Sequence, residues 1–213
     1  MTSLTFDLEQ MILLPGQSIL LKDVTWQEFE NAISKHRETR LAFERGMLEI
    51  MAPLPEHEYF KEAIGDLVKD LALELGINYE TLGSTTWKRE KFLSGAEADN
   101  CFYIQSLPFL RDKLNINLEI DPPPDLVIEI DITNKSLDRL QIFARLGVPE
   151  VWRYDRLLLR IYHLIDGLYI EMENSLAFSN FPIKLLPDFI RQNLSRDRLL
   201  LRRAFKDWVS SLG

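Results

Sequence analysis

The chain contains a single cysteine among its 213 residues. Cys101 therefore cannot form an internal disulfide, and no group of cysteine and histidine residues has the spacing of zinc ligands. No charged segment precedes the modest apolar patch at residues 11–14, so a signal peptide is not expected. These absences predict a cytoplasmic protein.

Long apolar runs and an excess of basic residues are also missing. The longest apolar runs are far shorter than the roughly twenty residues that a membrane-spanning helix needs, so no membrane span is predicted. The formal net charge of −8 argues against DNA binding by phosphate neutralisation alone. Metal ions held by acidic residues would weaken this objection, because they restore positive potential at the site. A basic cluster near the C-terminus is interpreted as a solvated helix face; it contains Arg191, Arg196, Arg198, Arg202, Arg203 and Lys206.

Hydrophobic residues make up 46% of the chain, which is enough to bury one sizeable core. We expect an N-terminal arm at residues 1–24, a single domain at 25–190, and a C-terminal helix at 191–213 that packs on the domain. The arm is interrupted by Pro15 and Gly16.

Apolar periodicity and turn signals predict a mixture of helices and strands. Thr25 and Glu28 form a capping box ahead of a helix that ends near Arg37. Further helices are expected at 56–75, 136–146 and 199–212, the first two ended by Gly76 and Gly147. Strands are expected at 41–44, 47–51, 77–82, 85–89, 101–104, 126–130, 151–154, 157–164 and 168–172, with a loop around 94–95. This order favours an α/β or α+β fold in which helices flank a sheet.

The strand at 126–130 carries the most informative polar residues. Glu129 interrupts its apolar run, Asp131 follows directly, and three prolines at 122–124 fix where the strand begins. The Thr133–Asn134 pair and Ser136 then offer helix-capping side chains. The two acids therefore lie at the boundary of an element, where functional sites tend to be built.

Asp99 precedes another expected strand. If the two strands are neighbours, Asp99 and Glu129 converge at one end of the sheet, and two close carboxylates must share a proton or bind a cation. Oxygen ligands without cysteine indicate Mg²⁺ or Mn²⁺ rather than zinc. Such an ion lowers the pKa of a bound water and stabilises charge on a phosphodiester. The pattern therefore favours metal-assisted hydrolysis.

Five segments resemble the Uma family, which is assigned to the PD-(D/E)xK restriction-endonuclease-like superfamily: LEIMAPLPEHE, GSTTWKRE, GAEADNCFYI, PDLVIEIDI and LDRLQIFARLGVPEVWRYD. The likeness covers residues 25–166. It implies a central mixed sheet flanked by helices, a metal-dependent nuclease site and a homodimer. Asp99 and Glu129 match the two acids of the family motif, and Arg139 lies where many members place a lysine.

Two positions depart from the family pattern. Ala98 stands in place of a proline, which alters only the loop. Arg139 in place of lysine matters more, because a guanidinium group can stabilise a phosphate but cannot readily exchange a proton at neutral pH. Lys135 and Lys88 are the possible substitutes for the missing amine.

Further residues are candidates for the same site. His57, at the start of the long helix, would either line the site or serve the structure. Glu58 or Glu62 on that helix would complete the ligand set, as a helix acid does in many members of the superfamily. Asp131 is either a helix cap or a residue that supports the metal ligands.

Three hypotheses remain open. The leading one is an Mg²⁺- or Mn²⁺-dependent endonuclease that hydrolyses DNA, with Asp99 and Glu129 holding the metal and Arg139 stabilising the transition state. The alternative is a catalytically degenerate nuclease fold that acts as a binding or assembly module, which the acidic charge and Arg139 favour. A third is a metal-independent fold whose acids serve only stability.

Overall fold

The computed structural model describes residues 12–35, 39–110, 112–113, 115–132 and 135–212. The helices in these ranges are α1 (Trp26–Lys35), α2 (Pro55–Glu74), α3 (Arg139–Leu146), α4 (Leu186–Asn193) and α5 (Arg198–Leu212). The strands are β1 (Ser18–Leu21), β2 (Arg40–Glu44), β3 (Met47–Met51), β4 (Glu80–Thr81), β5 (Thr86–Arg89), β6 (Ser94–Glu97), β7 (Asn100–Tyr103), β8 (Leu126–Ile130), β9 (Glu150–Tyr154), β10 (Leu159–Ile165) and β11 (Leu168–Met172).

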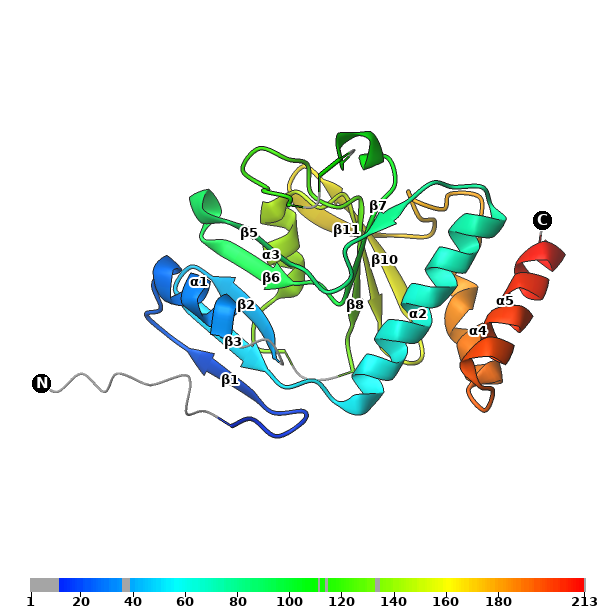
Figure 1. The fold of residues 1–213 in the computed structure, drawn as a ribbon, viewed down its shortest axis with the longest axis horizontal. Helices are drawn as coiled ribbons and strands as arrows, with labels where there is room; N and C mark the ends of the chain where they lie inside the picture. The colour runs from blue at the N-terminus through cyan, green and yellow to red at the C-terminus, as the bar shows by residue number, and fades with distance from the viewer. Residues whose placement is uncertain (1–11, 36–38, 111, 114, 133–134, 213) are drawn as a thin grey trace, which may run out of the picture.

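The described strands form two sheets (Figure 1). The first has the order β1-β3-β2-β6-β5 and is antiparallel throughout. The second has the order β11-β10-β9-β8-β7-β4, and its parallel pair is β8 and β9, with α3 in the crossover between them. The expected α/β class, with a mixed sheet flanked by helices, is confirmed, although the strands divide between two sheets.

Strand alternation places α2 and α3 on opposite faces of the second sheet. Ile128 and Trp152 join the apolar cluster that contains Leu67 of α2. Val127 and Val151, each one position away, join the cluster that contains Phe143 of α3. Because both faces of β8 and β9 are covered, Glu129 and Glu150 on these strands are buried and need partners.

Only Ala98 and Asp99 lie between β6 of the first sheet and β7 of the second. Asp99 therefore sits where the two sheets meet. The expected loop at 94–95 is wrong, since these residues open β6. A side chain at Gly95 would place its Cβ only 2.8 Å from the ring of Phe29, so the glycine reflects close packing of α1 against this strand rather than a turn.

Other boundaries also differ from the expectation. Of the strand expected at 77–82 only β4 forms, and the strand expected at 157–164 begins at Leu159. Helix α3 begins at Arg139 rather than Ser136, because the Asp138 side chain accepts a hydrogen bond from the Leu140 N–H (3.0 Å) and caps it. The expected helix end near Arg37 and the Thr133–Asn134 pair lie outside the described residues.

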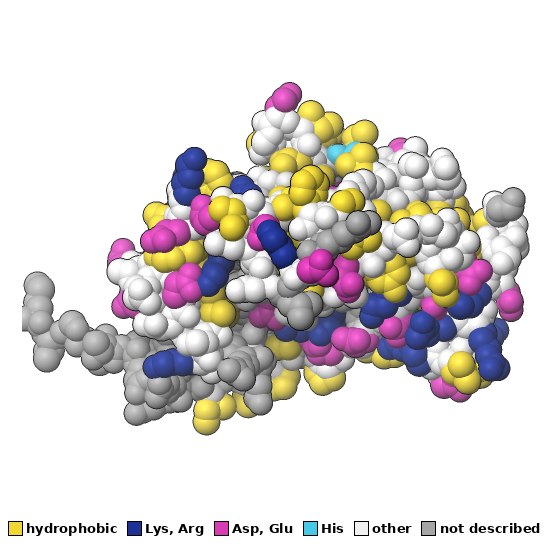
Figure 2. All heavy atoms as spheres, turned by 45° about the horizontal axis from the view of Figure 1, so that its top comes forward, with side chains coloured by type: hydrophobic (Ala, Val, Ile, Leu, Met, Phe, Trp, Pro, Cys, Tyr) yellow, Lys and Arg dark blue, Asp and Glu magenta, His cyan; other side chains and the backbone are white. Residues whose placement is uncertain are grey.

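The surface view mixes acidic and basic side chains, with basic ones gathered at the end of the molecule that α2 and α5 form (Figure 2). Helix α5 packs along α2. None of the described helices combines the length and the apolar character that crossing a membrane requires.

Candidate active site

Asp99 and Glu129 come together where β7 begins and β8 ends. The two strands are antiparallel, and Asn100 lies opposite Ile128. One residue further, Asp99 comes opposite Glu129, and opposed residues of antiparallel strands share a face. Both are almost completely buried, with 3% and 2% of their surface exposed. The expected convergence of the two acids therefore agrees with the strand register.

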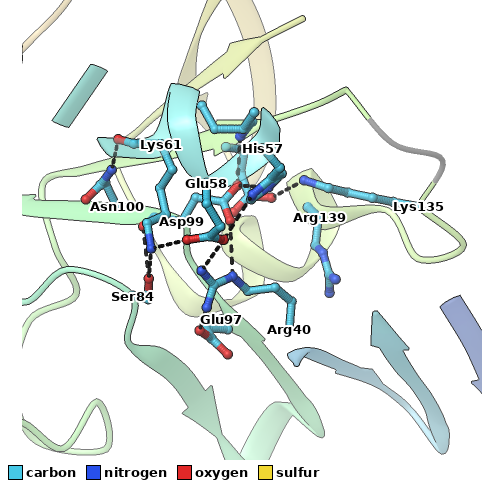
Figure 3. Close-up of polar contacts among 12 residues, drawn as sticks. Arg40, His57, Glu58, Lys61, Ser84, Glu97, Asp99, Asn100, Lys135 and Arg139 are labelled. Atoms are coloured by element: carbon cyan, nitrogen blue, oxygen red, sulfur yellow. Dashed lines mark hydrogen bonds and ion pairs between the residues drawn. The ribbon is translucent and has the colours of Figure 1, made fainter. Parts of the chain in front are cut away.

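Asp99 is held by the backbone and by α2 (Figure 3). Its Oδ2 accepts a hydrogen bond from the Ile130 N–H at 2.8 Å and lies 3.2 Å from His57 Nε2. Burial alone would raise the pKa of Asp99, but the hydrogen bond from His57 and the charge of Lys135 hold it well below its usual range. Asp99 is therefore a carboxylate.

His57 connects Asp99 to a second acid. The imidazole is completely buried, and its Nδ1 lies 3.3 Å from Glu58 Oε1. Burial alone would lower the pKa of His57, but the hydrogen bonds to Asp99 and Glu58 raise it to about 9. The same contact lowers the pKa of Glu58 to about 2. His57 is thus a buried cation that fixes the orientation of Asp99.

Arg40, at the start of β2, joins three acids. Its guanidinium pairs with Glu97, lies 2.8 Å from Glu58 Oε1, and places Nε 3.6 Å from Asp99 Oδ1. Burial raises the pKa of Glu97 even beside this cation. Arg40 was not among the expected residues, and no local signal distinguishes it, because its partners belong to α2, β6 and the link after β6.

Glu129 has one paired and one unpaired oxygen. Lys135 Nζ lies 2.7 Å from Oε2, and both side chains are at most one-tenth exposed. Oε1 is buried and has no hydrogen-bond partner among the described residues. Burial raises the pKa of Glu129. The positive charge of Lys135 lowers this pKa, and the negative charge of Asp99 raises it by a smaller amount. A buried oxygen without a partner is costly, and a cation at this point would remove the cost.

Arg139 does not pair with Glu129. As the first residue of α3 it places Nη2 3.1 Å from Oε2 of Glu49, a completely buried residue of β3. Glu49 also accepts a hydrogen bond from the Ser136 N–H. Nη1 of Arg139 is buried without a hydrogen-bond partner within the described part of the chain. Glu49 was not among the expected residues, since in the sequence it is one acid in an apolar strand.

A hollow of about 530 Å³ opens beside these groups. Glu129 and Arg139, each with a buried atom that has no hydrogen-bond partner among the described residues, line this hollow, and so do Asp131 and Arg153, which pair with each other. The lining residues are Glu129, Asp131, Lys135, Ser136, Leu137, Asp138, Arg139 and Arg153.

Two expected residues lie elsewhere. Lys88, on β5, pairs with Glu30 of α1 and lines a different hollow. Glu62 is 61% exposed at its side chain and lies 3.3 Å from Lys61. The cation beside Glu129 is therefore Lys135, and the acid of α2 nearest Asp99 is Glu58, which reaches it through His57.

The carboxylates of Glu129, which lines the hollow, and Asp99, which does not, suit a hard divalent ion. Glu129 offers an unpaired carboxylate oxygen, and Asp99 is the neighbouring carboxylate. No group of three or more His, Cys, Asp or Glu side chains poised for a metal occurs in the described ranges. This set fits Mg²⁺ or Mn²⁺, because such ions are often bound by one or two carboxylates and keep several waters.

Comparison with known proteins gives a family match and related solved structures. The family model Uma2, described as "Putative restriction endonuclease", matches residues 26–196. A crystal structure from Anabaena variabilis, described as a putative nuclease belonging to DUF820, aligns with a TM-score of 0.44 at 13% identity, covering 79% of this chain and 90% of that one. Among curated proteins, none matches the chain.

Proposed function

Because this chain belongs to the Uma2 family, we propose that it is a divalent-metal-dependent endonuclease that hydrolyses DNA phosphodiester bonds at the hollow beside Glu129. The observation that carries the proposal is the unpaired, buried Oε1 of Glu129 next to Asp99. Buried polar atoms without a partner are uncommon in native proteins, and a bound cation would account for this one.

Asp99 and Glu129 would hold the ion. When bound, Mg²⁺ or Mn²⁺ supplies Lewis acidity toward the phosphodiester and lowers the pKa of the attacking water. His57 and the Ile130 N–H keep Asp99 ionised and oriented through Oδ2, while Oδ1 lies 3.6 Å from Arg40 Nε. This arrangement favours a carboxylate that needs no reorganisation to bind a cation.

Lys135 and Arg139 would act on the phosphate. The Lys135 ammonium group lies 2.7 Å from Glu129. Lys135 is therefore better placed than Arg139 to take the part of the lysine in the family motif. Arg139 keeps a buried N–H donor, Nη1, that a non-bridging phosphate oxygen would satisfy. Both residues line the hollow, where developing negative charge on the phosphate oxygens would meet two cations.

The experiment is cleavage of supercoiled, linear and single-stranded DNA by the purified protein with Mn²⁺. Glu129→Gln, Asp99→Asn and Lys135→Met should each reduce the rate by about 10²-fold or more. Lys88→Met is the matched control and should keep the wild-type rate, because its amine pairs with Glu30 away from the hollow. Unchanged cleavage by Glu129→Gln would exclude this site.

The alternative is a non-catalytic module. This alternative is favoured because the cations near the site are already paired with acids of the same chain. Lys135 pairs with Glu129, Arg139 with Glu49, and Arg40 with several acids. Mn²⁺ binding followed by electron paramagnetic resonance separates the two functions. Binding that Glu129→Gln abolishes supports the nuclease, whereas no binding by the wild type or by Arg139→Lys supports the module. Light scattering tests the homodimer that the family likeness implies.

A further inference from the structure

Two buried acids of the first sheet reach across to α3. Glu49 of β3 accepts a hydrogen bond from the Ser136 N–H and pairs with Arg139, at the N-terminal end of the helix. We propose that Glu49 is a positioning residue that fixes the segment from Lys135 to Arg139 beside Glu129. The inference rests on the proposed function, because it concerns how the same site is held together.

The bond to Ser136 acts on Lys135 directly. The Ser136 N–H belongs to the planar peptide group that joins it to Lys135, so holding this N–H fixes the plane from which the lysine side chain leaves. Ser136 is otherwise exposed, and without Glu49 its amide would bond to water. Glu49 therefore ties an exposed segment to a buried strand.

The ion pair fixes Arg139 in the same way. Nη2 lies 3.1 Å from Glu49 Oε2, and the side chains of Glu49 and Arg139 are 0% and 6% exposed. The guanidinium is planar and rigid, so anchoring one nitrogen sets the direction of Nη1. Nη1 is the nitrogen without a hydrogen-bond partner in the described structure. One carboxylate thus orients both cations proposed to meet the phosphate.

Glu44 provides a matched control. It is another buried acid of the first sheet, 8% exposed, and it pairs with Arg145 near the C-terminal end of α3. It also accepts a hydrogen bond from Ser94 Oγ at 2.8 Å. Glu44 therefore joins the same sheet to the same helix, but at the end away from Lys135. A purely structural role predicts similar consequences for both acids.

The experiment compares Glu49→Gln with Glu44→Gln in the full chain. Amide hydrogen exchange, followed by mass spectrometry, should rise at least tenfold over residues 135–138 in Glu49→Gln and stay at the wild-type level there in Glu44→Gln. Mn²⁺-dependent cleavage should show a kcat about 10- to 100-fold lower for Glu49→Gln with KM changed less, since small displacements of catalytic groups are costly. Glu44→Gln should keep kcat within about twofold.

Two results would overturn the inference: unchanged exchange at 135–138 in Glu49→Gln, or an equal rise in both variants. If Glu49→Gln does not fold, the double variant Glu49→Met with Arg139→Met removes both buried charges together and should fold. Its exchange at 135–138 should still rise, and protection equal to wild type would contradict the proposal. If the wild type cleaves no DNA, the proposed function fails, while the exchange results still decide the role of Glu49.

Discussion

Two buried glutamates of the second sheet show what separates a structural acid from a functional one. Glu150 is completely buried, and both of its oxygens are satisfied: Trp152 Nε1 donates to Oε1 at 2.6 Å, and the N–H groups of Leu176 and Ala177 donate to Oε2 at 3.0 Å. Glu129 is equally buried but has one oxygen without a partner in the described residues. Glu44 and Glu49 also have a buried oxygen without a hydrogen bond, but an arginine pairs with each of these oxygens. The informative property of Glu129 is therefore an oxygen with neither a hydrogen bond nor an ion pair among the described residues.

At the residue scale, the single thiol allows a prediction of how stability depends on pH. Cys101 is completely buried, and this burial raises the pKa of its thiol from 9.0 to about 11. The folded protein therefore keeps a proton that the unfolded chain loses between pH 9 and 11, so stability should fall as the pH rises through this window. Urea unfolding from pH 8 to 11 measures the effect, and Cys101→Ala should lack this component. Rapid labelling of the native thiol at pH 8 would contradict the prediction.

At the scale of elements, α5 is attached to α2 by a ladder of ion pairs. Arg198, Arg202 and Lys206 pair with Asp66, Asp70 and Glu74 at 4.0, 2.7 and 3.3 Å. The residues on each helix are four apart, so the two helices run parallel in register. The basic cluster that the sequence analysis interpreted as a solvated face is thus partly neutralised by α2, which lies beside it in Figure 1.

Substitutions of two adjacent arginines of α5 test the contribution of these ion pairs to stability. Arg202 makes two hydrogen bonds of 2.7 Å to Asp70, whose side chain is only 3% exposed. Arg202→Ala leaves that carboxylate buried and unpaired, and should lower the free energy of unfolding by about 1–3 kcal/mol. Arg203→Ala, at an exposed position, should change it by less than about 0.5 kcal/mol. Urea denaturation measures both, and equal effects would argue against the ladder.

At the scale of the molecule, the net charge of −8 opposes binding of a polyanion. Affinity for DNA should therefore be weak without divalent ions and should increase when Ca²⁺, a hard ion that carboxylate oxygens bind, is added at constant ionic strength. Fluorescence anisotropy of a labelled duplex measures this. Asp99→Asn should remove the Ca²⁺-dependent increase. Tight binding without any divalent ion would indicate a basic contact surface instead.

The sequence predicted the elements whose signals are local. The long helix at 56–75 and the strands at 47–51, 126–130 and 168–172 are confirmed within a residue or two, because apolar periodicity, flanking prolines and the turn at Asp166–Gly167 act over short distances. β6 was missed because Gly95 reads as a loop residue until Phe29 of α1 is placed against it. No separate element was predicted from the sequence for the residues that form α4.

The sequence by itself determined that Asp99 and Glu129 are acids at the ends of apolar strands and that Lys135 follows close behind, since these depend on residue type and spacing. Only the tertiary structure decided which charges meet: His57 of α2 and Arg40 of β2 lie beside Asp99. Likewise, Glu49 of β3 pairs with Arg139 of α3. The physical reason is that a buried charge must find its partner in space, and two sheets folded against each other can supply that partner from any distance along the chain.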